Sequence, residues 1–145
     1  MDRRVRLLAL GVGVHLAAAL AHGGVHGLLP VGLTDWQTAT VVLALVAGPL
    51  AGLGVAVAGR LTAGASLVAA SLVIALAFEA LAHFVLVSPD NVGRVSAGHG
   101  VFIWTALLSL AGDAVGLGAA LRVLHTEYCD RVPVRPHAGV RSRQE

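Results

Sequence analysis

The sequence predicts an all-α integral membrane protein, a four-helix bundle whose helices cross the bilayer alternately up and down. Hydrophobic residues make up 57% of the 145-residue chain and charged residues only 12%, whereas soluble domains carry about 25% charged residues. Four apolar segments each have roughly the twenty residues that a helix needs to cross a bilayer. These segments are apolar on all sides, which is typical of helices that face lipid.

The four predicted spans cover about residues 7–29, 38–58, 65–87 and 100–124. Three segments rich in turn-forming residues separate them: LPVGLTDW (29–36), GRLTAG (59–64) and SPDNVGRVSAGHG (88–100). The second separator is short, so the second and third spans should form a tight antiparallel hairpin. Pro49 should bend the second span and free a backbone carbonyl that a neighbouring group must satisfy. Residues 125–145 are expected to form a basic, flexible tail.

The arginines predict the orientation of the bundle. All ten basic residues are arginines, and all but Arg94 fall on one side of the four-span arrangement. Positively charged residues that flank spans stay in the cytoplasm, so both chain ends are predicted to be cytoplasmic in a multi-pass protein of the cell membrane. The residues on that side are Arg3, Arg4, Arg6, Arg60, Arg122, Arg131, Arg135, Arg141 and Arg143.

The N-terminal segment also fits a different interpretation, a cleaved secretory signal peptide. It has a basic start, an apolar stretch and an Ala-Leu-Ala sequence just before His22. Cleavage there would remove residues 1–21 and leave three spans. The apolar stretch continues past this point and His15 interrupts its middle, so the four-span interpretation is favoured.

Ionisable side chains inside the predicted spans fall into two layers. Such groups are costly in lipid, so they face the bundle interior, a wet cavity or one another. Helical periodicity places the members of each span on one face, and their depths agree between spans. The outer layer, near the outer surface, contains His22, His26, Glu79, His83 and His99, and a deeper layer contains His15 and Asp113.

The outer layer predicts a metal or haem site. Imidazole and carboxylate groups are the usual ligands of zinc, copper and non-haem iron, and paired histidines on different helices can hold haem b. The predicted function is therefore metal or haem binding for electron transfer, metal handling or assembly of a redox complex. His15 and Asp113 are interpreted as a proton-linked pair.

A second hypothesis has no cofactor. The chain would be a transport or accessory subunit in which the buried histidine, glutamate and aspartate side chains form a proton relay or interhelical hydrogen bonds. No sequence feature defines a substrate, so a stand-alone enzyme is less favoured than either hypothesis.

One short pattern resembles a known copper motif. The segments EALAH (79–83) and GHG (98–100) are similar to the acidic-xxx-His…His motif in the C subunit of particulate methane and ammonia monooxygenases. The match covers Glu79, His83 and His99; glutamate replaces aspartate here, and the gap before the second histidine is longer. The resemblance implies that such spacing can serve a metal ion on adjacent membrane helices.

Small residues predict close helix packing. GPLAGLGVAVAG (48–59) and GDAVGLG (112–118) hold them at four-residue spacing, which suits a tight bundle, a homo-oligomer or a larger membrane complex. The arginines are not interleaved with aromatic residues, so no nucleic-acid partner is predicted. Cys129 is the only cysteine, which excludes an intrachain disulfide.

Overall fold

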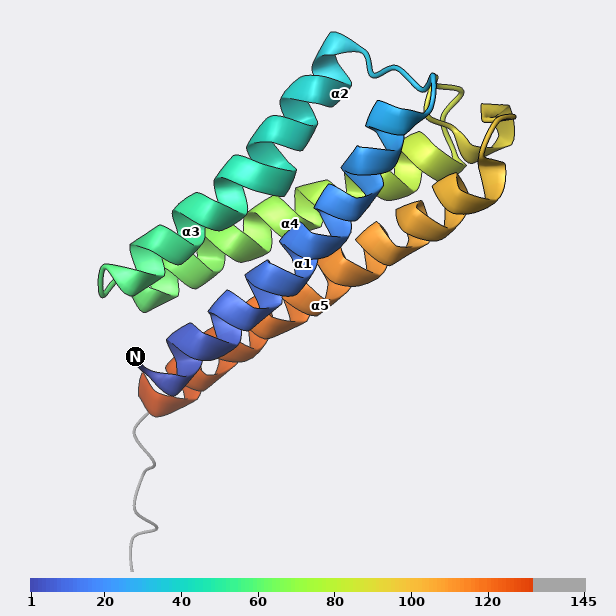
Figure 1. The fold of residues 1–145 in the computed structure, drawn as a ribbon. Coiled ribbons are helices and arrows are strands. Elements are labelled where there is room, and N and C mark those ends of the chain that lie inside the picture. The colour runs from blue at the N-terminus through green and yellow to red at the C-terminus, as the bar shows by residue number, and fades with distance from the viewer. Residues whose placement is uncertain (132–145) are drawn as a thin grey trace, which may run out of the picture.

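The computed structural model describes residues 1–131 and confirms the predicted all-α bundle (Figure 1). Within these residues, four helical segments are long and apolar enough to cross a membrane. They are α1 (Arg3–Leu28), a composite second span, α4 (Leu61–Phe84) and α5 (His99–Arg131). The second span consists of α2 (Asp35–Thr40), a π-helical segment η1 (Val41–Ala47) and α3 (Gly48–Val57). A short 3₁₀ turn, η2 (Val92–Arg94), lies in the loop before α5.

All four spans begin before the apolar segments that predicted them, and α5 also ends later. α1 begins at Arg3 because the Asp2 side chain caps it, accepting a hydrogen bond from the Arg4 N–H at 2.8 Å. α5 continues past the predicted end at 124, and Arg4 pairs there with Glu127 and Asp130 across the two helices. Residues 132–145 of the predicted tail lie outside the described residues.

The helices pack in the order α1, α5, α4, α3, and neighbouring helices are antiparallel (Figure 1). Contact between α1 and the second span is less extensive. These two neighbours therefore pack more loosely than the other pairs, and we call their boundary the seam. The hydrophobic core lies mainly between α1, α4 and α5, with further residues from η1 and α3. Its fully buried members include Leu8, Val12, Val68, Leu72 and Val123.

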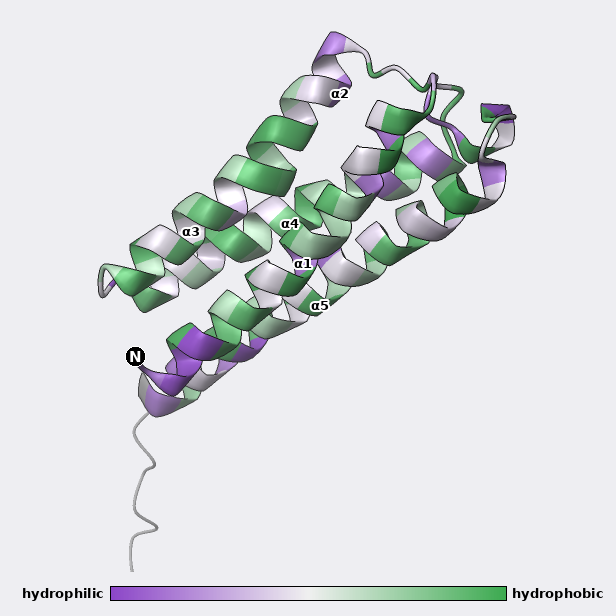
Figure 2. Ribbon diagram, viewed as in Figure 1, coloured by the Kyte–Doolittle hydropathy of each residue, from purple (hydrophilic) through white to green (hydrophobic). Residues whose placement is uncertain are grey.

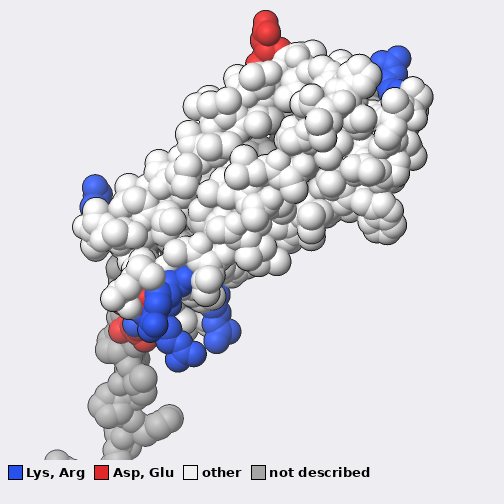
Figure 3. All heavy atoms as spheres, viewed as in Figure 1, with Lys and Arg blue, Asp and Glu red and all other residues white. Residues whose placement is uncertain are grey.

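The outer surface has the polarity expected of a protein embedded in lipid. Apolar residues cover the middle of the bundle (Figure 2), and Leu10, Leu20 and Trp104 are each about 70% exposed. In the face shown in Figure 3, charged side chains gather at the two ends of the bundle. Exposed apolar side chains of this number would be unfavourable in water, so the surface supports a membrane location.

The orientation in the membrane stays a prediction. The start of α1, the α3–α4 turn and the end of α5 share one end of the bundle (Figure 1), which is the end that the arginines predict to be cytoplasmic. Reporter fusions at residues 1 and 145 should both report a cytoplasmic location. Opposite locations would contradict the four-span orientation, and a mature chain that begins at His22 would establish the signal-peptide interpretation.

Pro49 leaves a backbone carbonyl without its helical donor, as the sequence predicted. It lies in the first turn of α3, directly after the π-helical segment η1. A residue at this position would normally donate its N–H to the carbonyl four residues earlier, that of Leu45, but proline has no N–H. The His15 Nε2 atom lies 2.7 Å from that carbonyl oxygen, so a side chain of α1 supplies the missing donor.

The α3–α4 hairpin depends on a backbone contact that only glycine allows. A Cβ atom on Gly64 would lie 2.5 Å from both the Ala56 nitrogen and the Gly52 carbonyl oxygen. Gly64→Ala should therefore push the two helices apart and lower the free energy of unfolding by about 1–3 kcal/mol. Gly54→Ala is the matched control, because a Cβ there meets nothing within 4 Å. Equal effects in detergent unfolding curves would contradict this account.

Candidate metal centre

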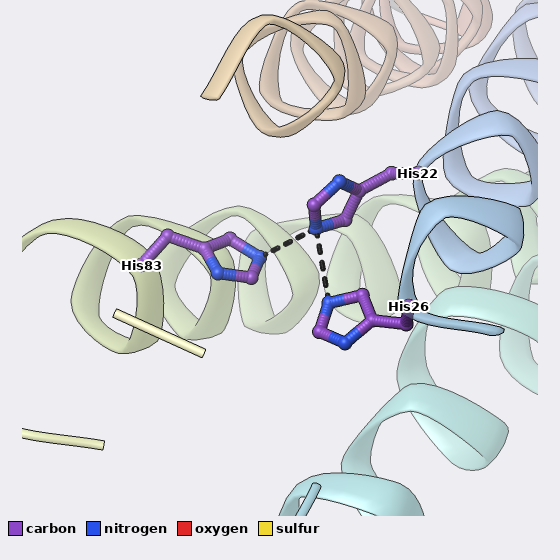
Figure 4. Close-up of side chains that lie close together, drawn as sticks. All are labelled: His22, His26 and His83. Carbon is purple, nitrogen blue, oxygen red and sulfur yellow. Dashed lines mark hydrogen bonds between the residues drawn. The ribbon is translucent and has the colours of Figure 1, made fainter. Parts of the chain in front are cut away.

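Three histidines from two helices meet near one end of the bundle. His22 and His26 lie one turn apart on α1, and His83 lies close to the end of α4 (Figure 4). The His22 Nε2 atom is 3.1 Å from His83 Nε2 and 3.3 Å from His26 Nε2. One ligand nitrogen from each residue lies within 4.8 Å of the other two. His22 and His83 are buried and His26 is partly buried.

Regular helix geometry explains this meeting. Residues separated by four positions share one helix face, so His22 and His26 both point from α1 toward α4. α1 and α4 run in the same direction through the bundle (Figure 1). All three histidines come late in their helices, which places them at matching depth.

Each of the three imidazoles has its Nδ1 atom next to a hydrogen-bond acceptor. His83 Nδ1 lies 2.9 Å from the Asp90 carbonyl oxygen, and His26 Nδ1 lies 3.3 Å from the Val31 carbonyl oxygen. His22 Nδ1 lies 3.0 Å from the Thr105 hydroxyl oxygen. That hydroxyl already directs its hydrogen to backbone carbonyls of its own helix, so it accepts from His22.

Because all three Nδ1 atoms face acceptors, the Nε2 lone pairs of the three histidines point toward one another. Carbonyl oxygens only accept hydrogen bonds, so each neutral imidazole carries its hydrogen on Nδ1 and has an unprotonated Nε2. Facing lone pairs at 3.1 and 3.3 Å repel unless a proton or a metal ion lies between them. A tetrahedral zinc ion with Zn–N bonds of about 2.0–2.1 Å would hold its nitrogens about 3.3–3.4 Å apart. The His22–His83 and His22–His26 spacings are close to that value, and one ligand nitrogen of each histidine lies within 4.8 Å of the other two.

Most of the residues around the three histidines are apolar. The fully buried ring of Phe102 lies 5.1 Å from the His22 and His26 ring centroids and 5.6 Å from that of His83. All three histidines also line a cavity of about 250 Å³ at the seam between α1, η1 and α4. The other residues that line it are Ala19, Gly23, Leu33, Val41, Leu45, Phe78, Glu79 and Asp90.

Asp90 supports His83, and sequence reasoning missed it. Its side chain is fully buried, and its Oδ1 accepts hydrogen bonds from Gln37 Nε2 at 2.6 Å and Ser88 Oγ at 2.7 Å. These bonds fix the loop whose Asp90 carbonyl orients the His83 ring. The segment SPDN predicts only a turn, and the sequence contains one signal for the role of Asp90, an acid seven positions after a histidine.

Removing the Asp90 side chain should weaken metal binding without abolishing it. Asp90→Ala is expected to reduce metal affinity about 10–100-fold, the range typical of groups that orient a ligand. The measurement is a competitive titration against a chromophoric chelator. Ser96→Ala, an exposed position in the same loop, is the control and should leave the affinity unchanged. Equal affinities for Asp90→Ala and the control would show that the loop does not support the site.

Glu79 lies one turn deeper than the three histidines. Its side chain is 1% exposed, and Ser109 Oγ donates a hydrogen bond to Glu79 Oε1 at 2.7 Å. The other oxygen, Oε2, has no hydrogen-bond partner in the described part of the chain. Glu79 lines the same cavity but does not belong to the group of mutually close ligand atoms.

His99 does not join the other predicted ligands. It is the first residue of α5, its side chain is exposed, and its Nδ1 donates to the Val95 carbonyl oxygen at 3.2 Å. Of the five residues predicted to converge, the structure brings three together, places Glu79 on the same cavity and leaves His99 outside. Thr105, which orients His22, is a further contact that the sequence did not indicate.

The deeper layer forms a direct contact between α1 and α5. His15 Nδ1 lies 2.6 Å from Asp113 Oδ1, and both side chains are fully buried. Because His15 Nε2 donates to the Leu45 carbonyl, the short contact to Asp113 requires one further proton between Nδ1 and Oδ1. The pair thus holds one shared proton, and its predicted role in proton chemistry stays a prediction.

Comparison with known proteins gives no relative from which to transfer a function. No family model, no curated protein and no solved structure matches the chain.

Proposed function

We propose that this chain is an integral membrane protein that binds one divalent transition-metal ion through His22, His26 and His83. One observation carries the proposal: three Nε2 atoms converge while each Nδ1 donates a hydrogen bond elsewhere. This arrangement fixes the tautomer that a metal ligand needs, with the hydrogen on Nδ1 and a free lone pair on Nε2. In protein metal sites, each histidine ligand typically donates its other ring N–H to a hydrogen-bond acceptor. Metal handling or assembly of a redox complex is the role that fits such a site best.

The donor set favours a divalent ion of intermediate softness. All three donors are imidazole nitrogens, which suit Zn²⁺, Cu²⁺, Ni²⁺ and Fe²⁺, whereas Cu⁺ prefers thiolate and thioether ligands. Cys129 lies near the end of α5, at the opposite end of that helix from the histidine group. The site should therefore bind Zn²⁺ or Cu²⁺ in preference to Cu⁺.

A metal ion fits better than haem b. Two histidines that bind haem must lie on opposite faces of a flat macrocycle. The His22 and His83 Nε2 atoms are 3.1 Å apart, so no macrocycle fits between them. Electron transfer through a single copper or iron ion stays compatible with the donor set.

The test is elemental analysis and a visible absorption spectrum of protein purified without chelator. We expect about one zinc or copper ion per chain and no Soret band. His99→Ala, a histidine at the same end of the bundle but outside the group, should keep the same metal content. A protein that holds no stoichiometric metal, even after incubation with Zn²⁺ or Cu²⁺, would refute the proposal, and a Soret band would replace it with haem binding.

Proton conduction is a second candidate function, and one observation favours it. Glu79 Oε2 and Asp113 Oδ2 are buried carboxyl oxygens without a partner among the described residues, and the shared proton of the His15–Asp113 pair lies in the same interior. Layers of this kind are typical of proton relays in membrane proteins. Asp113→Asn should then slow acidification of vesicles that contain the protein, and unchanged proton flux would exclude the relay.

A further inference from the structure

The metal site proposed above has three protein ligands and faces a cavity. We infer that an ion held by His22, His26 and His83 keeps a fourth coordination position toward this cavity, and that the position takes an exchangeable oxygen ligand hydrogen-bonded to Glu79. The ligand class is water or a small hydroxylic molecule. This inference rests on the proposed function and specifies what kind of metal site it is.

The number of protein ligands supports an exchangeable position. In the described part of the chain, the group of mutually close ligand atoms contains the three histidines and no fourth residue. Zinc sites that serve only structure have four protein ligands, whereas sites with three protein ligands bind water or substrate in the fourth position. Three histidines without a fourth protein donor belong to the second kind.

The cavity supplies the space. All three histidines line it, and its volume is about 250 Å³, whereas a water molecule needs about 10–15 Å³ measured in the same way. Several waters or one small molecule can therefore lie next to the ion. Most of the wall is apolar, from residues such as Leu33, Val41, Leu45 and Phe78, so a hydroxylic ligand with a small apolar body is accommodated.

Glu79 supplies the hydrogen-bond acceptor. Ser109 on α5 anchors its Oε1, and its Oε2 is buried without a donor among the described residues. A buried carboxyl oxygen without a donor is costly, and a metal-bound water or alcohol in the cavity that Glu79 lines would supply one. Asp90, which lines the same cavity, has an Oδ2 atom without a hydrogen bond among the described residues, although His83 Nδ1 lies 3.5 Å from it.

Glu79 is better placed to contact the fourth ligand than to be that ligand. A fourth protein oxygen in a tetrahedral site would lie about 3.3 Å from each histidine nitrogen. Glu79 stands outside the group whose ligand atoms lie within 4.8 Å of one another, and its bond to Ser109 holds it toward α5. An oxygen ligand on the ion that is hydrogen-bonded to Glu79 does not require Glu79 to belong to that group.

Cobalt substitution tests the inference. The full-length protein in detergent is loaded with Co²⁺, its cobalt content is measured, and its visible spectrum is recorded during a titration with sodium azide. Azide binds exchangeable positions on Co²⁺ and changes the visible bands. We expect about one Co²⁺ per chain, a four-coordinate spectrum and a saturable spectral change with azide. Glu79→Leu should keep a four-coordinate Co²⁺ spectrum, because Glu79 is not a ligand, but the azide concentration at half-saturation should shift, because the acceptor that contacts the exchangeable ligand is gone.

The outcomes separate this inference from the proposed function. A chain that fails to bind Co²⁺, Zn²⁺ and Cu²⁺ would refute the proposed function itself. Stoichiometric Co²⁺ with a spectrum that azide does not change would overturn only the exchangeable position. Loss of Co²⁺ or a changed coordination number in a folded Glu79→Leu variant would show that Glu79 is the fourth ligand, which also overturns the inference. If Glu79→Leu does not fold, Glu79→Gln, of the same size, decides the point by the same measurements.

Discussion

Replacing His22 by alanine should reduce bound metal from about one ion per chain to background. His22 is the centre of the group, since its Nε2 lies 3.1 Å from His83 and 3.3 Å from His26. Its removal leaves two histidines that do not share a short contact. The loss of affinity should exceed the 10–100-fold that follows from disturbing a supporting group. The measurement is metal content after purification, together with a chelator competition titration.

Two controls make this result specific. His99→Ala removes a histidine from the same end of the bundle without touching the group, so its metal content should equal that of the wild type. A helical circular dichroism spectrum shows whether the His22→Ala chain is folded. If the histidines only hold helices together, His22→Ala would instead lower stability by about 1 kcal/mol and the wild type would have no metal to lose.

The fold could be predicted from sequence because its main signal is local. Lipid imposes long apolar segments, and each segment reveals a span without any knowledge of its neighbours. The exact ends of the helices were harder to predict from the sequence. Arg3 and Arg131 lie outside the apolar segments, and what extends the helices there is a cap from Asp2 and ion pairs between α1 and α5, contacts that hydropathy does not encode.

In the candidate site too, some residues could be predicted from local spacing and others could not. The pairing of His22 with His26 follows from helical spacing, and its meeting with His83 follows from matching depth. His99 could not be placed by these rules, because it begins a helix after a loop and its direction depends on how that loop enters α5. Asp90 was missed because its role depends on bonds from Gln37 and Ser88, and only the folded loop brings these together.

The His15–Asp113 pair should give the largest effect on stability. His15→Leu is similar in volume, but it removes the only described partner of Asp113 and the donor to the Leu45 carbonyl that Pro49 leaves without its helical partner. Removing one member of a buried, hydrogen-bonded charged pair costs about 3–5 kcal/mol. The free energy of unfolding in detergent should fall by that amount, while metal content stays at about one ion per chain because the pair lies a layer below the histidine group.

Asp113→Asn should cost much less, and the difference between the two variants is the informative quantity. Asparagine can donate its amide hydrogen to His15 Nδ1 while His15 Nε2 still donates to Leu45, so the shared-proton contact is replaced by an ordinary hydrogen bond and the loss should stay within about 1 kcal/mol. In the double variant His15→Leu/Asp113→Val no buried carboxyl remains unpaired, and much of the stability should return, as it does when whole buried ion pairs are replaced by apolar residues. Equal losses in the two single variants, or no recovery in the double variant, would contradict the shared proton.

An ordinary interhelical hydrogen bond would instead give a loss averaging about 0.6 kcal/mol in either single variant, because neither substitution would then leave a buried, unpaired charged group.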